Sequence, residues 1–568
     1  MSAQSAQQPT HSNSAKNDLS TSPTPVSAAQ RHTPATPVNH ERLKFHLDAI
    51  GYDKVKTKYL VEGFKNGFRL DHDSPVSSAV PNNDPSIQSH HSIVQEKLDA
   101  EIAAGRLAGP FTSPPFPNCH ISPLKIVPKS TPGKFRLIQN LSWPYDDSSI
   151  NSNIPQESKS VDYVSIRKAI KLIMTFPKGS YTRKTDIQHA FKIIPIHPSD
   201  HHKLVFKFNG LYYYDITLPM GAGSACRIFE AFSTALQAIF DFHSVEGGLS
   251  VHYLDDFFFI DITKWASIAN TTVFDNLCLD IGVPQAPDKK TPPSHVTPFL
   301  GITLDSLKWF ATLPLDKLNN YLSSVHAVIS RKSISQKELQ SVVGKLSSAA
   351  AVVPARAFLR RLISKIPSGV SRFPIKVTSS MLQDLYAWIE FMTHYNGVTF
   401  FRAIAVLPDF HLNMGADASK QGYGATYGSY WIQERYPRSW RTIFEDKEIG
   451  ITVLELFPIL PLIATFGHKI KNSSILFHSD NQGVVDIINK QTSNSKKPMI
   501  MNIVRALVLL LMNHNIQLRS KHVPGNENHL CDCISRFQVT PSILKQHKMK
   551  LVPSQVPHRY SSATFKLS

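Results

Sequence analysis

The sequence contains little cysteine. Five of its 568 residues are cysteine, at positions 119, 226, 278, 531 and 533, which is too few to predict a disulfide framework. Low cysteine content is typical of proteins from reducing compartments. We therefore expect a cytoplasmic or nuclear location and no secretion.

Acidic residues are outnumbered as well. Asp and Glu total 43 against 61 Lys and Arg, which gives a formal net charge of +18 at pH 7. Such a surplus favours a polyanionic partner such as nucleic acid, although a basic balance can serve solubility alone. Charge by itself does not choose between these two interpretations.

Long hydrophobic runs are missing too. The first residues, MSAQSAQQPTHSNSAKND, have no apolar core, so we predict no signal peptide. The longest near-continuous apolar run, Ala506–Met512, is far shorter than the roughly 18 residues typical of a membrane span. We expect no membrane partner.

The pair Cys531 and Cys533 lacks the second pair that a zinc site requires, so we expect both to be small, partly buried residues.

Composition changes along the chain. Residues 1–40 are rich in Ser, Ala, Pro, Thr, Gln and Asn and cannot bury enough surface to offset their ordering entropy, so we predict disorder. Residues 41–104 read as a partly helical extension. Helical patterns recur over 312–367, and the tail, 541–568, is basic and irregular.

Strand and turn signals alternate after Asp186. FKIIPI predicts a strand, and KLVFKF and LYYYDIT flank Asn209-Gly210, the strongest short signal of a β-hairpin. An apolar helical pattern runs from Ser224 to Phe242, and HYLDDFFFI follows. This β-β-α-β-β order favours an α+β domain built on an antiparallel sheet.

Two adjacent acids interrupt the last of these apolar runs. Asp255 and Asp256 should lie at a hairpin, although Asp-Asp is a poor two-residue turn. A third acid, Asp186, ends the polar run YTRKTD. If the strands next to these acids pair, three carboxylates converge at one sheet end. Two magnesium ions about 3.5–4 Å apart are the usual way to hold such a cluster in phosphoryl transfer.

Five segments, in order, resemble the blocks of reverse transcriptases. The motif YLDD at 253–256 resembles the YXDD box, and TDIQHAFKI, which contains Asp186, resembles the first acidic block. The other three are KIVPKSTPGKFRLIQNLSWP (125–144), LPMGAGSA (218–225) and FLGITL (299–304). The resemblance implies a right-hand polymerase fold with fingers and palm at 105–305 and a helical thumb and connection at 306–400.

The resemblance also implies roles for individual residues. Asp186 and Asp255 would bind both metals, with Asp256 assisting. Lys129 and Arg136 would hold the nucleotide triphosphate, since a point charge and a guanidinium fork suit phosphate oxygens. As isolated residues, these two would read as solvated surface cations.

Two further substrate contacts follow from the same resemblance. Phe191 would block a ribose 2′-hydroxyl and so select deoxynucleotides, although the sequence alone favours an ordinary core phenylalanine. Lys289 or Lys290 would lie near the leaving pyrophosphate, and the sequence does not decide between them or exclude a solvated pair.

A second set of acids lies further along the chain. Asp417 is in HLNMGADASKQGYGATYG, Glu455 in TVLELFPI and Asp480 in ILFHSDNQGVV, while HVPGNENHLCDCISR holds His522 and Asp532. Asp480 could be a helix N-cap and Glu455 a surface helix residue. Apolar neighbours on both sides argue against a surface position for Glu455.

This second set resembles ribonuclease H, which uses four carboxylates and two magnesium ions. It implies a mixed five-stranded α/β domain at 405–540, with His522 helping product release. The amino-acid sequences of these motifs are similar to those of DIRS-type retroelements, which also encode a tyrosine recombinase. The sequence contains no His-X-X-Arg, so the recombinase module is absent, divergent or a partner on a separate chain.

The expected protein is therefore an RNA-directed DNA polymerase with ribonuclease H, using Mg²⁺ or Mn²⁺ as a substitute. Its partners would be an RNA template, a DNA primer, the RNA–DNA hybrid and deoxynucleoside triphosphates. Thumb cations would follow the nucleic-acid backbone; they are Lys337, Lys345, Arg360 and Arg361. The alternative is a repurposed or decayed retroelement protein that binds nucleic acid without catalysis.

Overall fold

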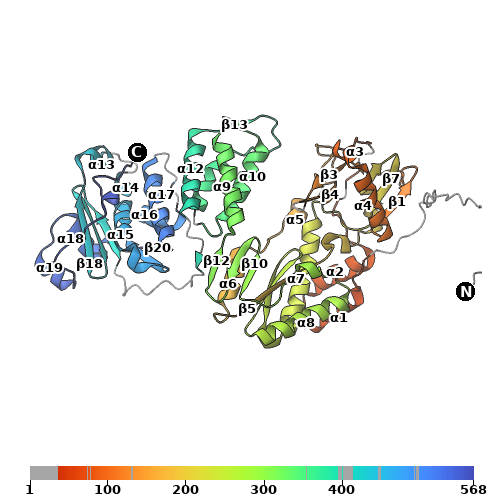
Figure 1. Ribbon diagram of the computed structural model, residues 1–568, viewed down its shortest axis with the longest axis horizontal. Coiled ribbons are helices and arrows are strands. Elements are labelled where there is room, and N and C mark those ends of the chain that lie inside the picture. The colour runs from red at the N-terminus through yellow and green to blue at the C-terminus, as the bar shows by residue number, and fades with distance from the viewer. Residues whose placement is uncertain are drawn as a thin grey trace, which may run out of the picture.

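The computed structural model describes residues 36–567 apart from 73, 77–78, 130–131, 354, 395–398, 401–413, 446–449, 492 and 494–497. Most of the segment predicted to be disordered, 1–40, therefore lies outside the described residues. Helices and strands are mixed at both ends of the molecule, and a helical region lies between them (Figure 1).

The N-terminal extension packs onto the first region and is part of it. Helices α1 (His40–Ala49) and α2 (Lys54–Asn66) share a hydrophobic core with α7 (Ala225–His243) and α8 (Lys264–Ile281). The Asn39 N–H donates to the Ile281 carbonyl at 2.7 Å, and Arg42 pairs with Asp280 at 2.6 Å.

A three-stranded antiparallel sheet forms the centre of the first region. Its strand order is β5 (Tyr181–Asp186), β9 (Asp256–Asp261) and β8 (Leu249–Tyr253). Phe257 and Phe259 enter the core beneath α7 and α8, while Phe258 and Ile260 enter a second core on the other face. Burial on both faces explains the unbroken apolar run in β9.

One strand expectation is wrong. FKIIPI is not a strand, because Ala190–Ile193 form a 3₁₀ helix, and the polar run YTRKTD is itself β5. The polar residue Arg183 is buried in this strand. Its guanidinium lies 3.9 Å from the Phe259 ring centroid and 3.7 Å from Asp261. A charge that faces an acid and an aromatic ring inside the core cannot be recognised from periodicity.

Two smaller β units complete the first region. One sheet has the order β1 (Leu107–Phe111), β7 (Leu211–Asp215), β6 (Val205–Phe208) and β2 (Ile121–Ser122). The hairpin predicted at Asn209-Gly210 is confirmed, with φ of 51° and 80°. The other unit pairs β3 (Leu124–Pro128) with β4 (Phe135–Gln139); α3 (Ser86–Ser89) and α4 (His91–Ala103) pack nearby, and α5 (Gln156–Lys159) and α6 (Ile166–Met174) follow.

The helical middle region begins after a short sheet. Strands β10 (Val296–Phe299), β11 (Ile302–Asp305), β12 (Phe310–Thr312) and β15 (Thr399–Phe400) pair in that order. The helices are α9 (Leu315–Ile329), α10 (Gln336–Ala349), α11 (Arg360–Ile363) and α12 (Ser379–Thr393), with β13 (Ser333–Ile334) and β14 (Ile375–Lys376) between them. The helices expected over 312–367 are present.

A five-stranded mixed sheet organises the second region. Its order is β18 (Tyr430–Arg435), β17 (Gly422–Tyr427), β16 (Gly415–Ala418), β19 (Ser474–Ser479) and β20 (Gln517–His522). Strands β16, β19 and β20 are parallel, and β17 and β18 are antiparallel. The helices are α13 (Arg441–Phe444), α14 (Gly450–Leu456), α15 (Ile459–Phe466), α16 (Gln482–Lys490), α17 (Pro498–Asn513) and α18 (His529–Ser535).

The C-terminal tail is largely irregular after its one α-helix, as expected, but it packs against the second region. After α19 (Pro541–Gln546), the chain runs beside β18, where Trp431 Nε1 donates to the Lys550 carbonyl at 2.8 Å. Near its end, Asn502 of α17 donates to the Leu567 carbonyl at 3.1 Å. Figure 1 accordingly places the C-terminus close to α14 and α17.

One helical stretch among the described residues, Gly450–Ile470, is long and apolar enough to cross a membrane. Proline and glycine residues interrupt this stretch, so the sequence shows no unbroken apolar run there. Its mean hydropathy is 1.7, but 72% of it is buried inside the fold. Burial of α14 and α15 in the core of the second region accounts for this apolar character.

Candidate active sites

Three acids meet where β5, β8 and β9 end, and we call Asp186, Asp255 and Asp256 the first carboxylate site. Asp186 and Asp256 are directly opposite each other in the antiparallel pairing of β5 and β9. Asp255 lies in the tight turn between β8 and β9, and its carbonyl accepts the Ile187 N–H at 3.0 Å. The sequence predicted this convergence, although through a different strand.

Negative charge at this site is incompletely balanced by the chain. Burial, followed by the charge of Asp186, raises the pKa of Asp255 to about 6. Burial also raises the pKa of Asp256 to about 6, against the opposing charge of Lys184. The Oδ1 atoms of Asp186 and Asp256 are buried and accept no hydrogen bond from the described residues. These oxygens are suited to a cation.

The two adjacent lysines of APDKKTPP point to different partners. Lys289 contacts Oδ2 of Asp186 directly. Lys290 instead pairs with Asp275 on α8. Of the two, only Lys289 reaches the first carboxylate site. Lys184, which the sequence analysis did not single out, lies 3.8 Å from Asp256. As a neighbour two positions before Asp186 on the same strand, it could have been found from the period of β5.

Lys129 and Arg136 belong to the β3–β4 hairpin. Arg136 pairs with Val127 across the hairpin, and Lys129 follows the end of β3. Both side chains are exposed. Slight burial and then the charge of Arg136 lower the pKa of Lys129, and the charge of Lys289 adds to this effect. The hairpin end therefore lies within electrostatic reach of the first carboxylate site.

Phe191 lies in the 3₁₀ helix that follows β5. Its side chain is 8% exposed, and its ring centroid lies 5.2 Å from that of Phe229 on α7. This packing is what a core phenylalanine requires. Its role in nucleotide selection stays a prediction.

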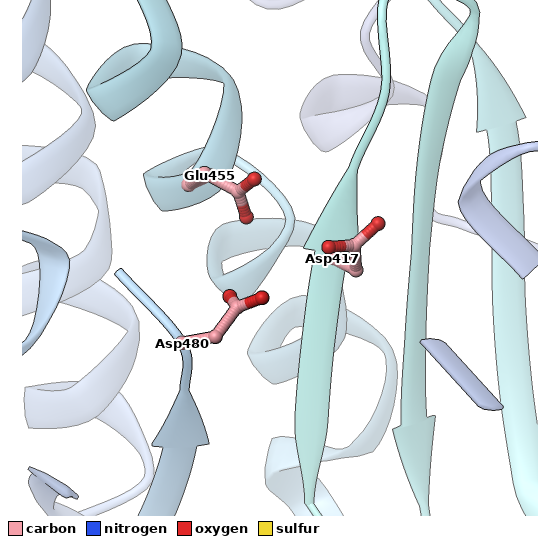
Figure 2. Close-up of side chains that lie close together, drawn as sticks. All are labelled: Asp417, Glu455 and Asp480. Atoms are coloured by element: carbon pink, nitrogen blue, oxygen red, sulfur yellow. The ribbon is translucent and has the colours of Figure 1, made fainter. Parts of the chain in front are cut away.

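A second cluster of acids lies in the C-terminal region (Figure 2). Asp417 comes from β16, Glu455 from α14, and Asp480 directly follows β19. Each offers one carboxylate oxygen, and these three oxygens lie within 4.8 Å of one another. Together with Asp532 of α18 we call them the second carboxylate site.

The simpler explanations for two of these acids do not fit the structure. Asp480 is not the N-cap of α16, since Asn481 accepts the Val484 N–H at 3.2 Å instead. Glu455 is 9% exposed and so is no surface residue. Parallel pairing of β16 and β19 explains why Asp417 and Asp480 lie side by side.

Mutual repulsion and burial dominate this site. Burial raises the pKa of Glu455 to about 9, and the charges of Asp417 and Asp480 add to it. Burial raises the pKa of Asp417 to about 6, although the Ser535 hydroxyl donates a hydrogen bond to its carboxylate. No lysine reaches these three acids among the ion pairs of the described chain, in contrast to the first site.

Asp532 and His522 lie at the edge of the second site. The Asp532 carboxylate pairs with Arg536 at 2.7 Å, and its negative charge still raises the pKa of Glu455. His522 is exposed at the end of β20, where its Nε2 lies 3.1 Å from the Asp480 carbonyl oxygen. The sequence analysis missed Ser535 and Arg536, although helical spacing from Asp532 would have indicated both.

Both sites fit magnesium by their donor chemistry. All their acidic ligands are hard carboxylate oxygens, which Mg²⁺ prefers. At Mg–O distances of about 2.1 Å, two ligand oxygens lie at most about 4.2 Å apart. Asp417, Glu455 and Asp480 would therefore need only small side-chain movements to share one ion. Metal binding would also stabilise the ionised form of each acid whose pKa is raised.

Comparison with protein-family models finds no match, and comparison with curated proteins finds no significant match. Among solved structures, the foamy viral protease-reverse transcriptase dRH with double-stranded DNA gives a TM-score of 0.47 at 16% identity, covering 87% of this chain and 83% of that one. The same viral protein with double-stranded DNA gives 0.45 at 16% identity, covering 85% and 96%. Its complex with an RNA/DNA hybrid gives 0.43 at 15% identity, covering 91% and 64%. Because these scores lie below 0.5, the function proposed below rests on the carboxylate sites.

Proposed function

We propose that this protein is an RNA-directed DNA polymerase of a retroelement with ribonuclease H activity on RNA–DNA hybrids. The observation that carries the proposal is the presence of two separate carboxylate sites, each assembled from distant segments. The five reverse-transcriptase-like blocks and the ribonuclease-H-like motifs support it. In this proposal the first region is fingers and palm, the middle region thumb and connection, and the second region ribonuclease H.

At the first site, Asp186, Asp255 and Asp256 would hold two magnesium ions. Bound there, the ions would lower the pKa of the primer hydroxyl and neutralise charge on the triphosphate. Lys289 lies against Asp186 and can donate to the leaving pyrophosphate. Lys129 and Arg136 would bind phosphate oxygens from the opposite hairpin, and Phe191 would limit the space at the ribose 2′ position.

At the second site, Asp417, Glu455, Asp480 and Asp532 would hold the metals for hydrolysis of the RNA strand. Bound there, the ions would supply an activated water near neutral pH. Arg536 pairs with Asp532 and so controls how far that carboxylate turns toward the other three. His522 is placed at the rim, where it can assist departure of the cleaved strand.

Cations of the middle region would contact the nucleic-acid backbone. Lys337 and Arg360 are exposed, whereas Lys345 donates to Ser324 and Arg361 lies 3.7 Å from Asp384. Arg361 is thus partly neutralised, and we expect Lys337 and Arg360 to contribute more of the salt-dependent affinity. The proposed partners remain the RNA template, the DNA primer, the hybrid and deoxynucleoside triphosphates, in the cytoplasm or nucleus. A DIRS-type element with its recombinase on another chain fits the motifs.

The decisive test separates the two activities. Primer extension on an RNA template is measured with the wild type, Asp255→Asn and Asp480→Asn, beside cleavage of a labelled hybrid. We expect Asp255→Asn to lose extension alone and Asp480→Asn to lose cleavage alone. Equal extension by the wild type and Asp255→Asn would reject the polymerase assignment. Nucleic-acid binding with neither activity in the wild type would instead favour the non-catalytic alternative.

A further inference from the structure

A cavity lies where the middle region, the second region and the C-terminal tail meet, and none of the motif acids lines it. Its volume is about 280 Å³. Glu390 of α12 and Asn502 and Arg505 of α17 line it on one side, and tail residues between 559 and 566 line it on the other. The proposed activities make no use of it.

The tail brings positive charge to this cavity. From residue 533 to residue 568 the sequence has no Asp or Glu, although it contains several Lys, Arg and His. Arg559 and Lys566 line the cavity and are exposed. With Arg505 they make three cations against the single acid Glu390. This surplus attracts an anion.

Arg505 is the most buried of the three cations that line the cavity. Its Nε is buried and has no hydrogen-bond partner among the described residues, while its NH1 lies 3.4 Å from the Asn502 side-chain oxygen. Burial lowers the pKa of Arg505, and the charges of Asp384 and Glu390 oppose that effect. The Nε is enclosed by protein and does not face the cavity, but the half-buried guanidinium lines the cavity and carries further N–H donors that suit phosphate.

The remaining walls of the cavity carry aromatic rings and hydrogen-bond acceptors rather than positive charge. Tyr560 and Phe565 present aromatic rings that are partly buried against the core, and the Phe565 centroid lies 5.6 Å from that of Phe457. Glu390 and Asn502 offer acceptors for N–H or hydroxyl donors. The cavity therefore combines cations for phosphate, rings for a flat group and acceptors for a polar edge.

We propose that this cavity binds one nucleotide, with its phosphate at Arg505, Arg559 and Lys566 and its base against Tyr560. The volume is close to the lower end of small-ligand sites and has room for a single nucleotide unit. Inorganic phosphate would leave the aromatic walls and Glu390 unused. The nucleotide is either free or the 5′-phosphorylated end of a single strand, because both present the same chemistry.

The test is calorimetric titration of the full-length protein in EDTA, so that metal-dependent binding at the carboxylate sites does not contribute. Adenosine 5′-monophosphate, guanosine 5′-monophosphate and a 5′-phosphorylated thymidylate 12-mer are titrated separately. Saturable binding of either mononucleotide identifies the free source. Binding of the 12-mer alone identifies a strand end, provided that the 12-mer without its 5′-phosphate binds at least tenfold more weakly.

The matched variants remove equal charge from the same tail. Arg559→Gln with Lys566→Gln should weaken binding at least tenfold, whereas Lys545→Gln with Lys548→Gln, which lie outside the cavity, should leave it unchanged. All four side chains are exposed, and thermal melting checks that each double variant folds. If one does not, the single pair Arg559→Gln and Lys545→Gln carries the comparison.

Three outcomes would overturn the proposal: no saturable binding of any probe at millimolar concentration, equal weakening by the two double variants, or a phosphate affinity equal to that of the nucleotides. Tyr560→Leu sharpens the last point, since it should weaken nucleotide binding and not inorganic phosphate binding. Asp255→Asn and Asp480→Asn should bind as the wild type does. Failure of the polymerase or nuclease assignment is therefore distinguishable from failure of this inference.

Discussion

The two carboxylate sites differ in how the chain balances their negative charge. At the first site Lys289 touches Asp186 and Lys184 lies 3.8 Å from Asp256. At the second site, among the residues that the structure describes, Arg536 is the one cation paired with an acid, and it pairs with Asp532 at the edge. Burial, and then the charges of Asp417 and Asp480, raise the pKa of Glu455 to about 9, whereas the pKa values of Asp255, Asp256 and Asp417 reach about 6.

This difference has a physical consequence. A site that carries its own lysines can hold its acids together before a metal arrives. A site of acids alone either keeps a proton or requires the metal for its assembly. The second region should therefore depend on divalent ions for stability more strongly than the first, in addition to any dependence of activity.

The largest expected effect is on hybrid cleavage by Glu455→Gln. Loss of a buried metal ligand should reduce cleavage by roughly three orders of magnitude or more. Primer extension should remain within about twofold, because the first site lies in another region. The exposed Glu445 lies in the same region, and Glu445→Gln is the matched control. Undiminished cleavage by Glu455→Gln would remove Glu455 from the second site.

In the absence of metal, Glu455→Gln should raise the free energy of unfolding. The folded-state pKa of Glu455, about 9, lies above the unfolded value of about 4.3, so the folded protein binds more protons between these limits. Stability in EDTA should therefore fall as pH rises from about 5 to 9, by up to about 5 kcal/mol at about 1.4 kcal/mol per pH unit.

Thermal melting across this pH range measures the effect. Glu455→Gln should flatten the pH dependence, and Mg²⁺ should stabilise the wild type most at the alkaline end. A melting temperature in EDTA that is constant between pH 5 and 9, or that rises, would contradict the proposed balance of charge at the second site.

Lysine substitutions address the first site. Lys289→Gln should lower kcat/KM for deoxynucleotide incorporation about tenfold or more, because a charge-assisted contact to phosphate is lost. Lys290→Gln removes only a half-exposed pair with Asp275 and should change kcat/KM less than threefold. Steady-state primer extension compares the two directly. A larger effect for Lys290→Gln would reverse the assignment.

Sequence motifs predicted the acids better than they predicted the strands that carry them. Asp186, Asp255 and Asp256 converge as expected. The sequence patterns, however, predict a strand over FKIIPI and not over YTRKTD, because the buried Arg183 makes β5 look polar. Local patterns cannot reveal a charge that is neutralised by a residue from another strand. The same limit hid the docking of the tail on β18, whereas the pairing of Asp532 with Arg536 is local and follows from helical spacing.

Alternatives left open by the sequence were decided by local geometry in some places and not in others. Asn481 rather than Asp480 caps α16, and Lys289 rather than Lys290 contacts Asp186. Each of these choices depends on the direction of one side chain, which composition and spacing do not specify. Phe191 packs in the core near the first site, so both of its interpretations still fit its surroundings.

The smallest expected effect is that of His522→Ala. This substitution compares the rim of the second site, where His522 lies, with the centre of the site. In the described part of the chain, the polar contact of its exposed ring is to the Asp480 carbonyl rather than to a carboxylate, so His522→Ala should leave the first turnover nearly unchanged. Multiple-turnover cleavage should slow about threefold to tenfold if the histidine assists product departure. His547→Ala, in the exposed part of the tail, is the control. Equal slowing of single and multiple turnover would instead place His522 in the bond-breaking step, and the distinction between rim and centre would no longer hold.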